Sequence, residues 1–238
     1  MNLNNSVAIV TGAGRGIGRA IALALAENGA NVVVSSRTQK EIDAAKEKII
    51  ALGRKSIAIR GDVAKEVDVK NVISQTVSEF GKIDILINNA GIGAFAPVTE
   101  LKTEDFDNMW ATNMRGVFLF SKYVIPHMAK QKSGNIVNIS SLAGRNAFKG
   151  GAGYSATKWA LIGFSRTLML EVREHNIRVI TLCPGSVDTD FSPSQKNPKE
   201  SSRIPKAEDI AKIVVNTLQM PDNVLVSEID IRPTNPNW

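Results

Sequence analysis

The stretch V-A-I-V-T-G-A-G-R-G-I-G, residues 7–18, carries the strongest indication of the fold. The apolar run Val7–Thr11 predicts a buried strand, the glycines after it predict a tight turn, and R-A-I-A-L-A-L-A predicts an apolar helix. Backbone N–H groups in such a turn, together with the N-terminus of the helix, can hold a pyrophosphate group. The residues expected to do so are Gly12, Gly14, Arg15, Gly16, Ile17 and Gly18.

The spacing of these glycines is T-G-x-x-x-G-x-G, which differs from the strict G-x-G-x-x-G of many dinucleotide-binding turns. Position 17 is Ile and position 19 is Arg, so the strict pattern does not match. A turn with a purely structural role is the alternative. The location of the turn, directly after the first strand and before a helix, favours binding.

Apolar, β-branched runs recur along the chain, with helical stretches between them. Continuous runs of this kind indicate strands that are covered on both faces. Regular alternation of strand and helix is typical of a parallel, doubly wound sheet with right-handed crossovers. With no internal linker or repeat, we expect one α/β (Rossmann) domain over residues 1–238, with about seven strands. The runs are 7–11, 31–35, 56–60, 83–88, 135–140, 177–183 and 224–231.

The composition argues against several classes of protein. Hydrophobic residues make up 43% of the chain and charged residues 22%, as in a globular protein. No run approaches the ~18 apolar residues that span a membrane, and the N-terminus lacks the features of a signal peptide. The single cysteine, Cys183, suits a reducing compartment. We therefore expect a cytoplasmic protein with no membrane partner.

The net charge of +6 raises the possibility of a nucleic-acid partner, because basic surfaces bind phosphates. The lysines and arginines alternate with acids, however, as in K-E-I-D-A-A-K-E-K, and form no basic block. We therefore expect no nucleic-acid binding. The two histidines, His127 and His175, are far apart and have no companion with ligand spacing, so we expect no metal site.

The end of the second strand, V-V-V-S-S-R, bears on the choice of dinucleotide. NAD-binding proteins usually place an acid there to bind the ribose 2′-hydroxyl. No carboxylate occurs here between Glu27 and Glu41, and Arg37 follows the serines. Arg37, with Arg15 from the glycine turn, could bind a 2′-phosphate instead. The sequence thus favours NADP(H), the alternative being that both arginines are ordinary surface residues.

Two short segments after the third and fourth strands suggest further contacts with the cofactor. In Gly61-Asp62-Val63, the Asp62 carboxylate could accept a hydrogen bond from the adenine amine or cap the next helix. In N-N-A-G, residues 88–91, small residues allow close approach of the cofactor and the amides can tie strands together. The residues expected at the site are Asp62, Val63, Asn89, Ala90 and Gly91.

The segment Y-S-A-T-K places Tyr154 and Lys158 one helical turn apart on the same face, and Ser141 lies thirteen residues before the tyrosine. A free tyrosine has a pKa near ~10 and is a poor acid at neutral pH. A nearby ammonium group stabilises the phenolate, so we expect Lys158 to lower the pKa of Tyr154. The group could then pass a proton to a carbonyl oxygen, which the Ser141 hydroxyl could also bind.

Taken in order, these motifs resemble the short-chain dehydrogenase/reductase family. The resemblance extends from about residue 7 to residue 189 and is closest to members that act as 3-oxoacyl-carrier-protein reductases. It is carried by T-G-x-x-x-G-x-G, N-N-A-G, the Asn113 of W-A-T-N-M, I-S-S, Y-S-A-T-K and C-P-G-S-V.

The resemblance implies hydride transfer from NADPH to a carbonyl carbon, with Tyr154 as the general acid in reduction and the base in oxidation. Lys158 would lower the tyrosine pKa and hold the nicotinamide ribose, and Ser141 would polarise the carbonyl. Asn113 would hold a water that links Lys158 to solvent. Contacts with the nicotinamide carboxamide and phosphates would come from Pro184, Gly185, Val187 and Thr189.

Two segments depart from the family pattern. The chain ends V-S-E-I-D-I-R-P-T-N-P-N-W, where many members have a glycine-rich segment. The segment after Thr189 is polar and is expected to give no bulky apolar cover.

The resemblance favours a 3-oxoacyl thioester on a carrier protein as the substrate. A small keto or 3-hydroxy acid, a semialdehyde or a pterin stays open, and a non-catalytic dinucleotide sensor is the alternative of a different class. Because the helix bearing Tyr154 is apolar around most of its girth, we also expect a homo-oligomer, either a tetramer or a dimer.

Overall fold

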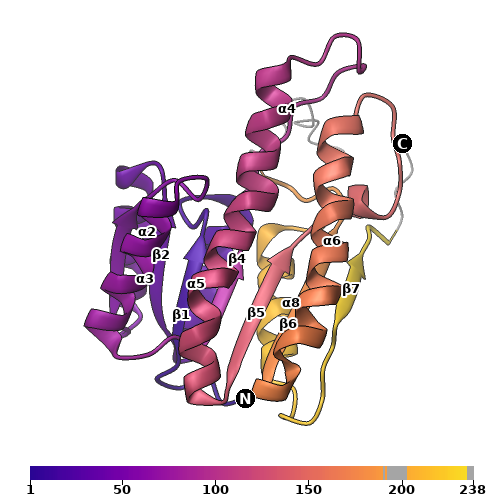
Figure 1. Cartoon of the computed structure of the whole chain (residues 1–238). Helices are drawn as coiled ribbons and strands as arrows, with labels where there is room; N and C mark the ends of the chain where they lie inside the picture. The colour runs from indigo at the N-terminus through magenta and orange to yellow at the C-terminus, as the bar shows by residue number, and fades with distance from the viewer. Residues whose placement is uncertain (190, 192–202, 235–238) are drawn as a thin grey trace.

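The computed structural model describes residues 1–189, 191 and 203–234, which fold around one parallel sheet (Figure 1). Its strands lie in the order β3-β2-β1-β4-β5-β6-β7, and every neighbouring pair runs parallel. The described residues thus confirm the predicted doubly wound α/β sheet of seven strands. The strands are β1 (Val7–Thr11), β2 (Asn31–Ser36), β3 (Ser56–Arg60), β4 (Ile85–Asn88), β5 (Gly134–Ile139), β6 (Ile177–Pro184) and β7 (Glu228–Ile231).

Helices cover both faces of this sheet, because successive strand side chains point to opposite faces. Val10 of β1 faces a core shared with α1, α2 and α8, whereas Ile9 faces the core shared with α3, α5 and α6. None of the helices in the described ranges has both the length and the hydrophobicity that a bilayer crossing needs. The helices are α1 (Gly16–Glu27), α2 (Gln39–Ala51), α3 (Glu66–Phe80), α4 (Thr103–Trp110), α5 (Gly116–Gln131), α6 (Ala152–Val172) and α8 (Ala207–Leu218).

Two strands, β4 and β7, begin later than the sequence pattern predicts. At the start of β4, the side-chain amide of Gln131 bonds both the N–H and the C=O of Ile83, at 3.3 and 3.0 Å. Before β7, the Arg178 guanidinium donates to the carbonyl of Val224 at 3.2 Å. Side chains thus occupy backbone groups that a longer strand would use.

The strand order reverses at β1, whose neighbours are β2 and β4. In an open parallel sheet, such a reversal leaves a crevice beyond the carboxyl ends of the strands. The glycine turn follows β1, N-N-A-G follows β4, Ser141 follows β5 and Pro184 ends β6. The topology therefore brings segments that are far apart in the sequence to one edge of the sheet.

Candidate active site

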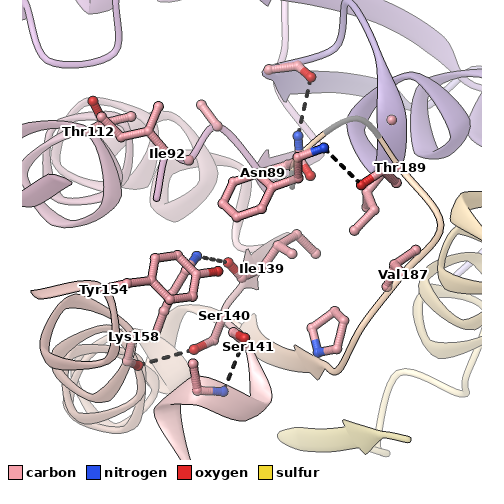
Figure 2. A pocket seen from close by; sticks show the side chains of 18 of the residues that line it. Asn89, Ile92, Thr112, Ile139, Ser140, Ser141, Tyr154, Lys158, Val187 and Thr189 are labelled. Atoms are coloured by element: carbon pink, nitrogen blue, oxygen red, sulfur yellow. Dashed lines mark hydrogen bonds between the residues drawn. The ribbon is translucent and has the colours of Figure 1, made fainter. Parts of the chain in front are cut away.

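A pocket of about 880 Å³ lies at this edge, within the size range of small-molecule and cofactor sites (Figure 2). It extends from the glycine turn and the end of β2 to Tyr154 and the loop after β6. The predicted site residues that line it are Gly12, Gly14, Arg15, Gly16, Ile17, Arg37, Asp62, Val63, Asn89, Ala90, Gly91, Ser141, Tyr154, Lys158, Pro184, Gly185, Val187 and Thr189.

The glycine turn has backbone geometry that a side chain would disturb. Gly12 and Gly16 have φ values of +64° and +53°, which L-residues with a Cβ rarely adopt. A Cβ on Gly14 would lie 2.6 Å from the Glu41 carboxylate oxygen. Arg15 is the N-cap residue of α1, and among the residues that the structure describes no side chain caps this helix N-terminus. Its backbone N–H groups therefore have no side-chain partner in that part of the chain.

Gly18, also predicted to contact the cofactor, lies behind the turn and is not among the residues that line the cavity. A Cβ at this position would overlap the carbonyl oxygen of Gly12 and the side-chain amide of Asn89. Gly18 is therefore needed because α1 packs directly against the turn and the loop after β4.

At the far end of the pocket from Tyr154, Arg37 follows β2 and lines the cavity. The sequence reasoning missed Glu41, which lines the same end beside Gly14 and Ser36. Glu41 could have been predicted from its place in the first turn of α2. Side chains in a helix point back toward its N-terminus, which here lies at the cavity.

Asp62 lines the pocket, and its carboxylate also accepts a hydrogen bond from the N–H of Ala64 at 3.0 Å. It does not cap the next helix, which begins at Glu66 with Lys65 as its N-cap residue. The capping alternative is therefore wrong, and the carboxylate instead closes a local turn at the edge of the cavity.

Tyr154 and Lys158 lie one turn apart in α6, both buried, and face the Ser141 loop (Figure 2). Ser141 caps a short 3₁₀ turn, its Oγ accepting from the N–H of Ala143 at 3.1 Å. Ser140 donates its hydroxyl to the backbone carbonyl of Lys158 at 3.1 Å. Of the two serines, Ser141 is the one whose side chain lowers the pKa of Tyr154, against the larger effect of burial.

The environment shifts the pKa of Tyr154 in the direction opposite to the prediction. Burial raises it to about 12, and the hydrogen bond from Ser141 only partly offsets this. The Lys158 ammonium lies 5.6 Å from the ring centroid and donates to the carbonyl of Ile139 at 2.9 Å. Burial lowers the pKa of Lys158 to about 8. Desolvation is therefore the larger influence on the pKa of the tyrosine.

Asn113 is buried behind the cavity and does not line it. It lies in a π-helical turn, Ala111–Arg115, between α4 and α5. Its amide exchanges two hydrogen bonds with the backbone of Ile92, both at 2.9 Å, and donates to the Thr157 hydroxyl at 3.0 Å. The side chain thus ties the loop after β4 to α6, next to Lys158.

Three phenylalanines, Phe95, Phe148 and Phe191, line the cavity around Tyr154 and were not predicted as site residues. Phe191 contradicts the expectation that the segment after Thr189 gives no bulky apolar cover, because its ring centroid lies 5.9 Å from that of Tyr154. The rest of that segment, residues 190 and 192–202, lies outside the described residues.

The unusual C-terminal segment supports the Ser141 loop through ion pairs. Arg145, just after the 3₁₀ turn, binds Glu228 and, at 3.2 Å, Asp230 of β7. Arg166 of α6 binds Glu228 from the other side at 2.6 Å. Hydrogen bonds from Arg166 and Arg145 lower the pKa of Glu228 to about 2, so it is charged at neutral pH.

In the part of the chain that the structure describes, no three His, Cys, Asp or Glu side chains gather where they could hold a metal ion.

Comparison with known proteins agrees with this arrangement. The family model described as short chain dehydrogenase matches residues 6–200. An uncharacterized oxidoreductase of Thermotoga maritima is 38% identical over 225 residues, 89% of each chain. The 3-oxoacyl-(acyl-carrier-protein) reductase FabG of Staphylococcus epidermidis is 42% identical over 189 residues, 79% of this chain and 78% of the relative.

Among solved structures, an alcohol dehydrogenase from the archaeon Thermococcus sibiricus, complexed with 5-hydroxy-NADP, superposes with a TM-score of 0.91. It is 31% identical, and the match covers 99% of this chain and 100% of that one. The chain described here belongs to the short-chain dehydrogenase family of oxidoreductases.

Proposed function

We propose that this protein reduces a carbonyl group to an alcohol with NADPH. The observation that carries the proposal is the convergence of Ser141, Tyr154 and Lys158 at one end of a cavity whose other end is the glycine turn. An acid and a cation lie where a substrate can reach them, and a dinucleotide fits along the rest of the cavity. A dinucleotide sensor would have no use for the acid.

The cavity suits NADP(H) in the chemistry of its residues. The turn around Gly12 and Gly16 and the uncapped N-terminus of α1 offer backbone N–H groups to a pyrophosphate. Arg15 and Arg37 offer guanidinium groups to a 2′-phosphate. The relative from Thermococcus sibiricus, which was solved with 5-hydroxy-NADP, supports this choice. When bound, the cofactor supplies the hydride for the carbonyl carbon.

Tyr154 donates the proton to the carbonyl oxygen. Its pKa of about 12 keeps the hydroxyl protonated at neutral pH, so the acid is present before each turnover. Lys158, whose pKa is about 8, is mostly charged at pH 7 and stabilises the phenolate as it forms. Ser141 donates a hydrogen bond to the same carbonyl oxygen. Oxidation of an alcohol would use the same groups in reverse.

Asn113 acts mainly as a positioning residue in this proposal. Both of its amide N–H groups are taken, by the carbonyl of Ile92 and the hydroxyl of Thr157. A water that links Lys158 to solvent would therefore donate to the remaining lone pair of Asn113 Oδ1.

The proposed substrate is a 3-oxoacyl thioester on a carrier protein. The 42% identity to FabG of Staphylococcus epidermidis and the net charge of +6, which suits an acidic partner, support it. The 38% identity to an uncharacterized oxidoreductase keeps a small keto or 3-hydroxy acid, a semialdehyde or a pterin as the alternative.

We also propose a cytoplasmic homo-oligomer, a tetramer or a dimer. The location is supported by the one cysteine, Cys183, which is buried and unpaired. The assembly is supported by large apolar side chains that α5 and α6 expose, among them Phe118, Trp159 and Leu170, the last of which is 57% exposed.

Leu170→Glu should lower the molecular mass of the protein in solution, because it places a charge on the proposed interface. Sedimentation velocity at micromolar concentration would show the wild type as a dimer or tetramer and the variant as a smaller species. Leu52→Glu, a half-exposed leucine after α2, is the matched control and should leave the mass unchanged. A monomeric wild type would refute the assembly.

Tyr154→Phe should bind NADPH as the wild type does and lose about 100-fold or more in kcat, the usual share of a general acid. NADPH affinity is read by fluorescence titration and turnover by NADPH oxidation with ethyl acetoacetate. The chain has two tyrosines, so Tyr123→Phe on α5 is the matched control and should keep its rate. Near-normal turnover in Tyr154→Phe would contradict the acid role.

Arg37→Ala should weaken NADPH binding by about tenfold or more, because a charge-assisted hydrogen bond contributes roughly 1.5–3 kcal/mol. NADH has no 2′-phosphate, so its affinity should change little. Kd values for both cofactors, measured by titration, give the comparison. Arg173→Ala, after the end of α6, is the control. Equal losses for NADPH and NADH in Arg37→Ala would defeat the 2′-phosphate contact.

The kcat/KM for reduction should fall as pH rises through about 8. Below that pH the Lys158 ammonium is charged, above it the amine is neutral, and Tyr154 stays protonated throughout. Lys158→Arg should abolish the fall, since a guanidinium does not titrate there. If Lys158→Arg has no turnover, the NADPH affinity of the wild type and of the variant is measured over the same pH range in place of kcat/KM. A wild-type profile that stays flat through pH 8 would contradict the assignment.

A further inference from the structure

Three phenylalanine rings from three separate loops line the cavity beside Tyr154. Phe95 follows β4, Phe148 precedes α6 and Phe191 follows β6. The ring centroids of Phe95 and Phe191 lie 5.5 and 5.9 Å from that of Tyr154, and Phe95 lies 5.9 Å from Phe148. These residues, here called the phenylalanine wall, adjoin the side chain proposed to protonate the substrate.

Glycines make room for the rings of this wall. A Cβ on Gly93 would lie 2.8 Å from the Phe95 ring and 3.3 Å from the Phe191 ring, and one on Gly151 would overlap the Phe148 ring. The N–H of Ala96 also donates to the carbonyl of Gly150 at 3.0 Å, which joins the Phe95 loop to the Phe148 loop. The rings of Phe95 and Phe148 therefore belong to one connected unit.

The wall leaves apolar surface uncovered inside the cavity. Phe95, Phe148 and Phe191 are 47%, 47% and 46% exposed, although they line a pocket. Most aromatic side chains of this size bury more of their surface, so a bound group that covered the rings would gain from the hydrophobic effect.

Apart from Lys158, the charged groups of the cavity lie away from the wall or are already paired. Most belong to the glycine turn and to the ends of β2 and β3, the end proposed for the cofactor. Arg232 lines the cavity after β7 and is paired with Asp230 at 3.4 Å. Among the described residues that line the cavity, Lys158 is the only cation beside the wall without an acidic partner, and its ammonium donates to the carbonyl of Ile139 at 2.9 Å. The wall therefore offers no second cation to a short anionic substrate such as a keto acid. The charged lining residues at the cofactor end are Arg15, Arg37, Glu41 and Asp62.

We propose that the phenylalanine wall binds a flat apolar group of the substrate, a phenyl ring or its equivalent, placed next to the carbonyl that Tyr154 protonates. Aromatic rings pack on one another edge to face or offset, at centroid separations like those between Phe95 and its neighbours Phe148 and Tyr154. This inference rests on the proposed carbonyl reduction and names its substrate class. If the substrate is a 3-oxoacyl thioester, the inference means that its acyl group ends in an aromatic ring.

Two 3-oxo esters that differ in one group test the proposal. The ethyl esters of 3-oxo-4-phenylbutanoic acid and 3-oxobutanoic acid carry a benzyl or a methyl group on the same carbonyl. The methylene spacer keeps the ring out of conjugation, so the carbonyls have similar reactivity. NADPH oxidation by the intact protein should give a kcat/KM at least about tenfold higher for the benzyl ester, since burial of a phenyl-sized group is worth more than one factor of ten.

Phe95→Ala and Phe148→Ala should each reduce this benzyl-to-methyl ratio several-fold and leave the rate with the methyl ester within about twofold. Phe95→Leu should restore part of the ratio by replacing apolar area without the ring. Phe118→Ala, on α5 and outside the cavity lining, is the matched control because it is 46% exposed. Any effect of Phe118→Ala on assembly would act on both esters and cancel in the ratio.

The outcomes separate this inference from the proposed function. If neither ester is reduced with NADPH, nor acetoacetyl-coenzyme A, the carbonyl reductase itself is refuted. If the wild type reduces both esters at the same kcat/KM, or prefers free 3-oxobutanoate, only the wall as a substrate site is refuted. Equal losses for both esters in Phe95→Ala and Phe148→Ala would also refute it, because they would show a purely structural role.

Discussion

The junction between β1 and β4 is the contact on which the rest of this structure depends. The Thr11 hydroxyl donates to the carbonyl of Ile87 at 3.1 Å and accepts from the N–H groups of Asn89 and Ala90 at 3.0 and 3.1 Å. The Asn89 amide donates in turn to the carbonyls of Thr11 and Gly12. These bonds fix the two loops that diverge where the strand order reverses, and so they hold open the crevice in which the cavity lies.

The substrate end of the cavity depends on a second set of contacts, around α6. The Asn138 amide of β5 accepts from Asn88 of β4 at 2.9 Å and donates to Ser165 of α6 at 2.8 Å. Further along, Arg145 and Arg166 share the Glu228 carboxylate of β7. These groups come from β4, β5, α6 and β7. Several independent contacts therefore fix the position of α6, which carries Tyr154, relative to the sheet. A buried tyrosine and a buried lysine, both with shifted pKa values, need such support.

Much of the fold and of the cofactor end could be predicted because local sequence determines them. The apolar runs of β1 and β2 indicate strands buried on both faces, and positive φ at Gly12 and Gly16 requires glycine whatever surrounds them. The errors occurred where distant side chains intervene. Gln131 shortens β4 and Arg178 shortens β7. Neither effect can be predicted from the residues of the strand itself. The packing of Gly18 was hidden for the same reason, since its neighbour Asn89 is close only in space.

By itself, the sequence determined that the chain forms a doubly wound sheet with a glycine turn after its first strand, and it determined the spacing of Tyr154 and Lys158 within one helix. These features follow from backbone sterics and from periodicity, which act over a few residues. Only the tertiary structure decided the sign of the Tyr154 pKa shift, the burial of Asn113 behind the cavity, and the gathering of Phe95, Phe148 and Phe191 around the tyrosine. Desolvation and ring packing depend on which residues of other elements surround a side chain. Those neighbours are determined only when the loops after β4, β5 and β6 meet at one edge of the sheet.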